Sequence, residues 1–246
     1  MVGTVIELDN DYPPSEGVPT ISIPPWLNLL ADSQFSAALK HVVVSEYVKN
    51  LPLIIKDGVT DLPLKFLSTT SQPTLLSSAL NFNDAEGIRF DSPAEGSNLT
   101  FLVVANVSNS MISDGVTSTL LQHPGNGTNG QIFIIKNTSG NLVLQLRTGE
   151  TVFNTISAGT HVIMGTYKSN LRLLRLWIDS TTPLKTKTTV GGPTYDGYSG
   201  WNIGSSNSGV NGWKSGIYMA AFFTEDITRY PDWTKLFNLL KSYYEV

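Results

Sequence analysis

Apolar and polar positions alternate along most of this chain from about Leu51 onward. Segments of strand length and composition lie at 98–107, 130–137, 141–149, 160–168 and 171–179. In the third of these, Leu142, Leu144 and Leu146 fall on one face, while Gln145 and Arg147 fall on the other. This alternation predicts half-buried antiparallel strands.

Turn-forming residues separate these segments. Asn126-Gly127, Asn129-Gly130 and Ser139-Gly140-Asn141 tolerate the positive φ that tight hairpins require. No helical pattern lies between the strands, and parallel sheets need long crossovers. The pattern therefore predicts an all-β sandwich or barrel of antiparallel strands over residues 51–246.

The N-terminal fifth of the chain has a different pattern. Residues 1–26 carry five prolines between short apolar pieces, which favours an extended arm over the interior of a sheet. In the segment 27–50, Asp32 or Ser33 can cap a helix, and apolar residues from Phe35 to Val42 recur at helical spacing. The β-branched run 42–44 opposes a helix there. We expect residues 1–50 to form an arm and a helix outside the sandwich.

The C-terminus shows a helical period. Trp233, Leu236, Phe237, Leu240 and Tyr244 form one apolar stripe, with an acidic residue before it and a basic residue near its end. A short terminal helix packed on the sandwich is predicted.

Composition narrows the classes of partner. Charged residues make up only 15% of the chain, its net charge is -4 and its pI is near 5.3, which opposes binding to a phosphate backbone. The absence of cysteine excludes disulfides and thiolate sites. There is no basic region before an apolar run at the N-terminus and no apolar run of about 20 residues. We expect no cleaved signal peptide, no membrane insertion and no nucleic-acid partner.

Segments in fixed order resemble a known fold family. They are ALNFNDAEGIRFDSPAEGSNLTFLVVANV, LLQHPGNGTNGQIFIIKNTSGNLVLQLRTG, GTHVIMGTYKSNLRLLRLWID and WNIGSSNSGVNGWKSGIYMAAFFTEDIT. Together they are similar to the concanavalin A-like jelly roll of lectins and glucanases, within its laminin-G-like branch. The resemblance covers residues 73–246 and implies an antiparallel jelly-roll sandwich. Because the motifs are structural, they indicate a fold rather than a function.

The acidic residues do not match a catalytic pattern. The related glucanases carry E-x-D-x-x-E on one strand, which is absent here. Asp84 and Glu86 lie in a turn, and Glu225 and Asp226 precede the terminal helix; residues at such positions usually act as caps or lie in solvated turns. The three histidines show no metal-ligand spacing. We expect no catalytic residue, no metal site and no enzymatic activity.

We expect no cofactor, with calcium as the alternative that the sequence leaves open. Asp114, Asn126, Asn129 and Asp196 offer the oxygen ligands that this cation takes. The metal motif of legume lectins is missing, and single loop aspartates mostly form turns.

A sugar is the ligand that best fits the loop-rich segment 193–213. Its aromatic rings suit the C–H face of a sugar, and its amides suit the hydroxyl groups. The candidate ligand-binding residues are Tyr195, Tyr198, Asn207 and Trp213, with Trp201, Asn202 and Asn211 in the same segment. Both tryptophans border predicted strands, so packing in the core is their alternative role.

A locally basic segment precedes this loop. It comprises Lys168, Arg172, Arg175, Lys185 and Lys187, with Asp179 as the acidic residue among them. We expect a solvated or subunit-contacting face there rather than an anion site.

The resemblance and the arm together predict a non-enzymatic structural or adhesion protein of a phage virion, on its capsid or tail. It would be made in the host cytoplasm, form a homo-oligomer and display a lectin-like domain, with cell-surface glycans as a further partner. Its arm would contact other virion proteins through Ile6, Ile21, Ile23 and Trp26. The alternatives are a stand-alone carbohydrate-binding module or lectin, and a glucanase-like enzyme.

Overall fold

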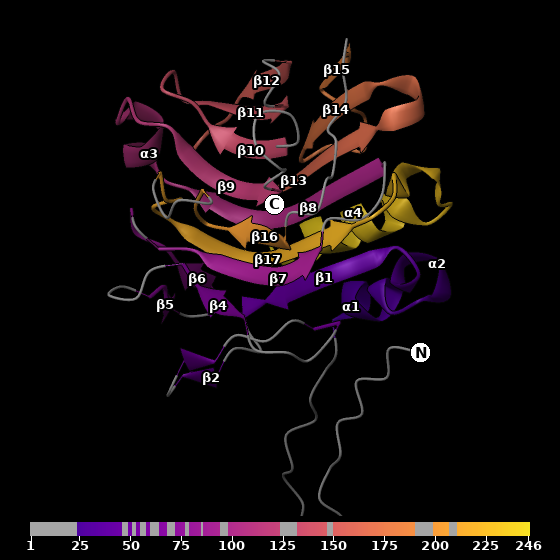
Figure 1. Cartoon of the computed structure of the whole chain (residues 1–246), viewed down its shortest axis with the longest axis horizontal. Coiled ribbons are helices and arrows are strands. Elements are labelled where there is room, and N and C mark those ends of the chain that lie inside the picture. The colour runs from indigo at the N-terminus through magenta and orange to yellow at the C-terminus, as the bar shows by residue number, and fades with distance from the viewer. Residues whose placement is uncertain are drawn as a thin grey trace, which may run out of the picture.

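The computed structural model shows two antiparallel sheets packed face to face, with three of the described helices packed on the outer face of one sheet (Figure 1). It describes residues 24–45, 49–50, 53–54, 58–59, 64–67, 72–76, 79–84, 86–93, 98–123, 132–146, 150–189, 199–206 and 211–246. The predicted all-β sandwich with a short C-terminal helix is confirmed.

The first sheet lies between the helices and the second sheet, and we call it the helix-covered sheet. Its strand order is β15-β14-β13-β8-β17-β6-β5, and β1 also pairs with β17. The strands are β1 (Leu39–Val44), β5 (Thr74–Leu76), β6 (Ala79–Asn81), β8 (Asn98–Val107), β13 (Gly159–Lys168), β14 (Leu173–Ile178), β15 (Lys185–Thr188) and β17 (Gly216–Phe223). The predicted strand at 98–107 matches β8 at both ends.

The second sheet has the order β12-β11-β10-β9-β16-β7-β4. Its strands are β4 (Lys65–Phe66), β7 (Ile88–Pro93), β9 (Ser118–His123), β10 (Ile132–Lys136), β11 (Asn141–Leu146), β12 (Thr151–Thr155) and β16 (Ser199–Ile203). A separate pair joins β2 (Lys49–Asn50) to β3 (Leu53–Ile54). The remaining elements are the helices α1 (Pro25–Leu30), α2 (Ser33–Ser36), α3 (Asn109–Ser113) and α4 (Trp233–Tyr243), and the 3-10 turns η2 (Ser169–Leu171) and η3 (Ile227–Arg229).

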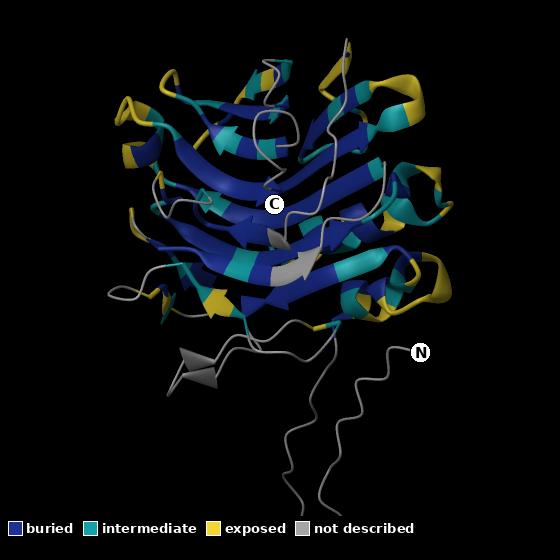
Figure 2. Cartoon of the chain, in the orientation of Figure 1, coloured by how far each residue is buried: buried dark blue, intermediate teal, exposed yellow. Residues whose placement is uncertain are grey.

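The main core fills the space between the two sheets. Leu142, Leu144 and Leu146 of β11 point into it, as their alternation predicts. The turn before β11 uses Gly140 at φ +76°, a conformation that favours glycine. Figure 2 shows this burial along the strand interiors, with exposed residues gathered at turns and helix ends.

A second core lies on the other face of the helix-covered sheet. Apolar residues of β1, β8, β13 and β17 meet the helices α1, α2 and α4 there. Both faces of this sheet are therefore buried, which explains why the strand 217–223 is apolar on both sides. The predicted C-terminal stripe is confirmed, since Leu236, Phe237 and Leu240 of α4 join this core.

The helix predicted within 27–50 is present at its expected cap, but it ends at Ser36. Helix α2 has four residues, with Asp32 as its N-cap accepting a hydrogen bond from the Gln34 N–H at 3.1 Å. The chain then enters β1, where residues 42–44 pair with β17. Their branched side chains favour an extended backbone, and pairing with β17 supplies the cross-strand partners that an extended backbone needs. Helices α1 and α2 pack on the helix-covered sheet, and β1 is one of its strands.

The buried Trp26 corrects its expected role as an assembly contact. Its side chain is 0% exposed, and its ring lies 6.1 Å from that of Tyr243 and 6.2 Å from that of Tyr244. The other predicted anchors, Ile6, Ile21 and Ile23, lie outside the described residues.

Candidate functional site

The outer face of the second sheet is where we locate the candidate site. Helices α1, α2 and α4 all pack on the helix-covered sheet, and Met111 of α3 joins the main core. The described residues therefore place no helix on this outer face.

A row of seven residues crosses this face from one edge strand to the other. Cross-strand pairing joins each residue to the next, and each belongs to a different strand. At strand spacings of about 4.8 Å, the row spans roughly 29 Å. We call it the outer row; its members in order are Lys65, Arg89, Asn202, Gln122, Phe133, Gln145 and Thr151.

Alternation along each strand sets the direction of these side chains. Trp201 and Ile203, on either side of Asn202, both lie in the main core. Asn202 therefore points to the opposite face, together with its cross-strand partners Arg89 and Gln122.

Asn202 is the unusual member of the outer row. Its residue is 0% exposed, and neither Nδ2 nor Oδ1 has a hydrogen-bond partner. No other amide side chain in the described ranges leaves both of its polar atoms buried and unpaired. Such a group costs about 1–3 kcal/mol in desolvation, so its position requires an explanation.

The neighbours of Asn202 supply complementary chemistry. Gln122, the neighbour of Asn202 on β9, adds a second amide at 2% exposure. Arg89, its neighbour on β7, adds a half-buried guanidinium on the same face. Phe133, two strands from Asn202, is a half-buried aromatic ring on the same face. Amides, a cation and an aromatic ring in one row can hold a hydroxyl-rich ligand that also has apolar C–H surfaces.

The sequence-predicted ligand residues have mixed outcomes. Tyr195, Tyr198 and Asn207 lie outside the described residues. Trp213 is 0% exposed, and its Nε1 donates to the Asn106 carbonyl at 3.1 Å. Trp201 is equally buried in the main core. Both tryptophans are core residues, and Trp213 presents no surface to a sugar.

Of the four calcium candidates, the structure describes Asp114 alone. Asn126, Asn129 and Asp196 lie outside the described residues. Asp114 accepts hydrogen bonds from Lys136 Nζ at 2.5 Å and from the Val116 N–H at 2.9 Å. Burial alone would raise the pKa of Asp114, but these hydrogen bonds and the nearby lysines hold the pKa below its usual value. Within the described ranges, no three histidine or acidic residues form a metal-ligand cluster.

One carboxylate of each pair, Glu86 and Asp226, holds a turn. Glu86 accepts hydrogen bonds from the backbone N–H of Asn83 at 2.7 Å and from its side chain at 3.3 Å. Asp226 caps η3 and accepts a hydrogen bond from Arg175 at 2.5 Å. These contacts use the carboxylates to hold turns, as expected for residues at such positions.

His161 holds the turn between β14 and β15 to the start of β13. Its Nδ1 lies 2.6 Å from Asp179 Oδ2, and its Nε2 lies 2.9 Å from the Ser157 carbonyl oxygen. Both partners accept hydrogen bonds, so the doubly protonated ring fits this position. Burial alone would lower the pKa of His161, but the hydrogen bond and charge of Asp179 outweigh burial and raise it.

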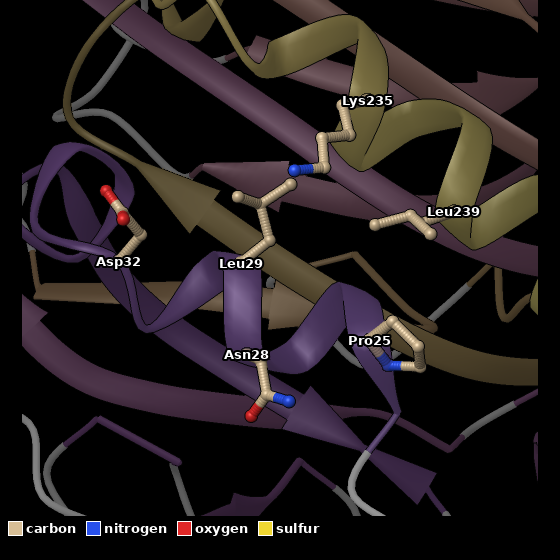
Figure 3. Close-up of a pocket in the computed structure, with 6 residues that line it drawn as sticks. All are labelled: Pro25, Asn28, Leu29, Asp32, Lys235 and Leu239. Atoms are coloured by element: carbon tan, nitrogen blue, oxygen red, sulfur yellow. The ribbon is translucent and has the colours of Figure 1, made fainter.

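A groove on the helix side offers different chemistry. It lies between α1 and α4, has a volume of about 380 Å³ and includes Asp32 among its lining residues. Leu29, Lys235 and Leu239 point into the space between the helices, whereas Asn28 points away from α4 (Figure 3). Its lining contains no aromatic ring, so it fits a sugar less well than the outer row does. No described helix is long and apolar enough to cross a bilayer.

Comparison with known proteins shows the fold. No protein-family model and no curated protein matches the sequence. Among solved structures, the Trypanosoma rangeli sialidase in complex with sialic acid has a TM-score of 0.58 at 11% identity, over 84% of this chain and 33% of the sialidase. The receptor binding domain of botulinum neurotoxin C/D mosaic serotype also has a TM-score of 0.58, at 8% identity, over 85% of this chain and 51% of that one.

These structures are β-sandwiches of the lectin-like kind, and the chain shares this fold. The chain spans about a third of the sialidase and about half of the neurotoxin domain. The laminin-G-like branch and the virion setting stay predictions.

The expectation that the chain is not an enzyme is corrected by this comparison. It depended on the resemblance to structural proteins and on the missing glucanase motif. Several of the similar solved structures are sialidases, at 11–13% identity and covering about a third of the sialidase chain. Enzymes as well as lectins contain this sandwich, so the fold gives no ground for excluding catalysis.

Proposed function

We propose that this chain is a lectin-like domain that binds glycans across the outer face of its second sheet. The observation that carries the proposal is the amide of Asn202, which is buried, unpaired and central in the outer row. A site built to hydrogen-bond a ligand leaves its polar groups unsatisfied when the ligand is absent. Sugar hydroxyls both donate to and accept from an amide, which makes them suitable partners for both of its atoms.

Other features support a neutral, hydroxyl-rich ligand. Only 15% of the residues are charged, so the protein surface offers more amide and hydroxyl groups than ions. The similar structures include a sialidase in complex with sialic acid and a receptor binding domain. Because Asn202 has no exposed surface, the proposal requires the atoms that cover it to move aside when the glycan binds.

The experiment is a glycan array probed with the wild-type chain and with Asn202→Leu. The expected result is a set of bound glycans for the wild type and loss of that signal in the variant. Asn28→Leu is the matched control, because it removes an exposed amide on the helix side. Equal binding by the wild type and Asn202→Leu, or no binding by the wild type, would refute the proposal.

The wider setting that we propose is display of this domain on a larger assembly, such as a virion, through residues 1–23. The sequence supports this by the prolines and apolar anchors Ile6, Ile21 and Ile23. Deleting residues 1–23 should leave glycan binding intact and remove the chain from purified particles of its source. Normal incorporation of the shortened chain would contradict this setting.

A further inference from the structure

A second groove lies where the edges of the two sheets meet. Edge strand β12 of the second sheet and edge strand β15 of the helix-covered sheet form its walls. Its volume is about 240 Å³, and its lining residues are Thr151, Val152, Phe153, Lys185, Thr186 and Lys187. Thr151 is also the last member of the outer row, so the groove continues the candidate glycan site at that end.

The sandwich geometry brings two lysines to this groove. Lys185 and Lys187 pair with Leu176 and Leu174, whose side chains lie in the main core. The lysines therefore point toward the second sheet, which ends there at β12. Lys187 forms an ion pair with Glu150 at 2.6 Å.

Lys185 differs from Lys187 in its surroundings. It is exposed and makes no ion pair within the described part of the chain. Since Glu150 neutralises Lys187, the groove presents about one uncompensated positive charge. Of the residues in the expected basic face, Arg175 thus forms an ion pair with Asp226 and Lys187 forms one with Glu150, while Lys185 lies at the groove.

Phe153 adds an aromatic surface. It points away from the main core and is 54% exposed, while its neighbour Val152 lies inside that core. An exposed ring beside an ammonium group and the Thr151 and Thr186 hydroxyls matches the surface of a sugar that carries one negative charge.

We propose that this edge groove binds the anionic sugar of an acidic glycan, with the neutral sugars of the same glycan along the outer row. Lys185 pairs with the carboxylate or sulfate ester, Phe153 packs on the C–H face of the sugar, and the threonines contact its hydroxyls. This inference rests on the proposed glycan-binding function and adds the charge class of the ligand. A single free ammonium suits a monoanionic sugar better than a phosphate, which favours forked arginine or several backbone N–H donors.

Three probes that share one neutral disaccharide test the inference. They are lactose, sialyllactose with a carboxylate and lactose bearing a sulfate ester, and binding is measured by calorimetry at low and high salt. The wild type should bind one or both anionic probes more tightly than lactose, and added salt should reduce the difference. Comparison of the two anionic probes tells the carboxylate from the sulfate.

Variants separate the charge from the ring. Lys185→Gln should weaken anionic probes about two- to fivefold and leave lactose unchanged, as expected for an exposed ion pair. Phe153→Ala should weaken all three probes, since each loses the same C–H contact. The controls are Lys235→Gln on the helix side and Leu171→Ala, whose side chain has the same 54% exposure as Phe153. These exposed positions leave the fold intact, which circular dichroism checks.

The outcomes distinguish this inference from the proposed function. Equal affinity for lactose and the anionic probes, or an unchanged affinity in Lys185→Gln, overturns the edge groove but leaves glycan binding standing. Binding to an array together with no binding of the anionic probes also overturns it. Absence of any glycan binding refutes the proposed function itself.

Discussion

Replacing Asn202 by leucine tests the proposed site and the energetics of its buried amide together. Leucine has the same number of side-chain heavy atoms and the same branching, so the space around the residue stays filled. The change removes one donor group and one acceptor that are buried and have no hydrogen-bond partner in the protein.

The magnitude follows from the desolvation of the amide. A buried polar group without a partner lowers stability by about 1–3 kcal/mol through desolvation, and an apolar group of the same shape has no such penalty. We therefore expect Asn202→Leu to raise the free energy of unfolding by about 2 kcal/mol. For a chain of 246 residues, the melting temperature should rise by about 4–8 °C.

The assay is urea denaturation followed by tryptophan fluorescence, with calorimetry for the melting temperature and the glycan array for binding. The variant should be more stable than the wild type and should lose glycan binding, which is the trade-off expected of a functional site. Asn28→Leu should change stability by less than about 0.5 kcal/mol. A less stable Asn202→Leu would show that the amide has a structural role, and the reasoning would then fail.

Three further predictions concern the fold. His161, paired with Asp179, has a raised pKa; its stabilising contribution is therefore complete below pH 6.5 and is lost as the pH rises through the raised value. In Asp179→Asn, the free energies of unfolding measured below and above that pH window should become nearly equal. A variant that keeps the pH dependence of the wild type would contradict the pairing. Trp26→Ala should destabilise the monomer by about 3–5 kcal/mol in urea denaturation; a role in assembly alone would leave the monomer unaffected. Gly204→Ala should cost about 2–4 kcal/mol, because its φ is +76° and a Cβ would lie 2.4 Å from a phenylalanine ring carbon. Gly115→Ala, also at positive φ but with nothing within 4 Å, isolates the backbone part in the same melting experiment.

Local patterns were enough to define most strands and the terminal helix. The leucines of β11, the stripe of α4 and the hairpin turn at Gly140 each depend on neighbours in sequence, so period and turn chemistry predict them directly. The segment at 39–44 misled the prediction because its helical spacing competed with β-branched residues. Pairing with β17, more than 170 residues away, decided that it is a strand.

The outer row depends on register, which the sequence does not encode locally. Asn202 was named as part of a sugar-binding segment, but Gln122 and Arg89 were not connected to it. These residues come together only because β16 pairs with β9 on one side and with β7 on the other. A shift of one residue in either pairing would send the partner side chain into the core.

The sequence by itself determined that the chain forms antiparallel strands with a neutral polar surface and a helical end. Tertiary structure alone decided which sheet the helices cover, that Trp213 and Trp26 are buried, and that Lys185 reaches the edge of the opposite sheet. The physical reason is that periodicity fixes which face of a strand is apolar. Only the packing of distant elements fixes which faces meet and which polar groups are left without a partner.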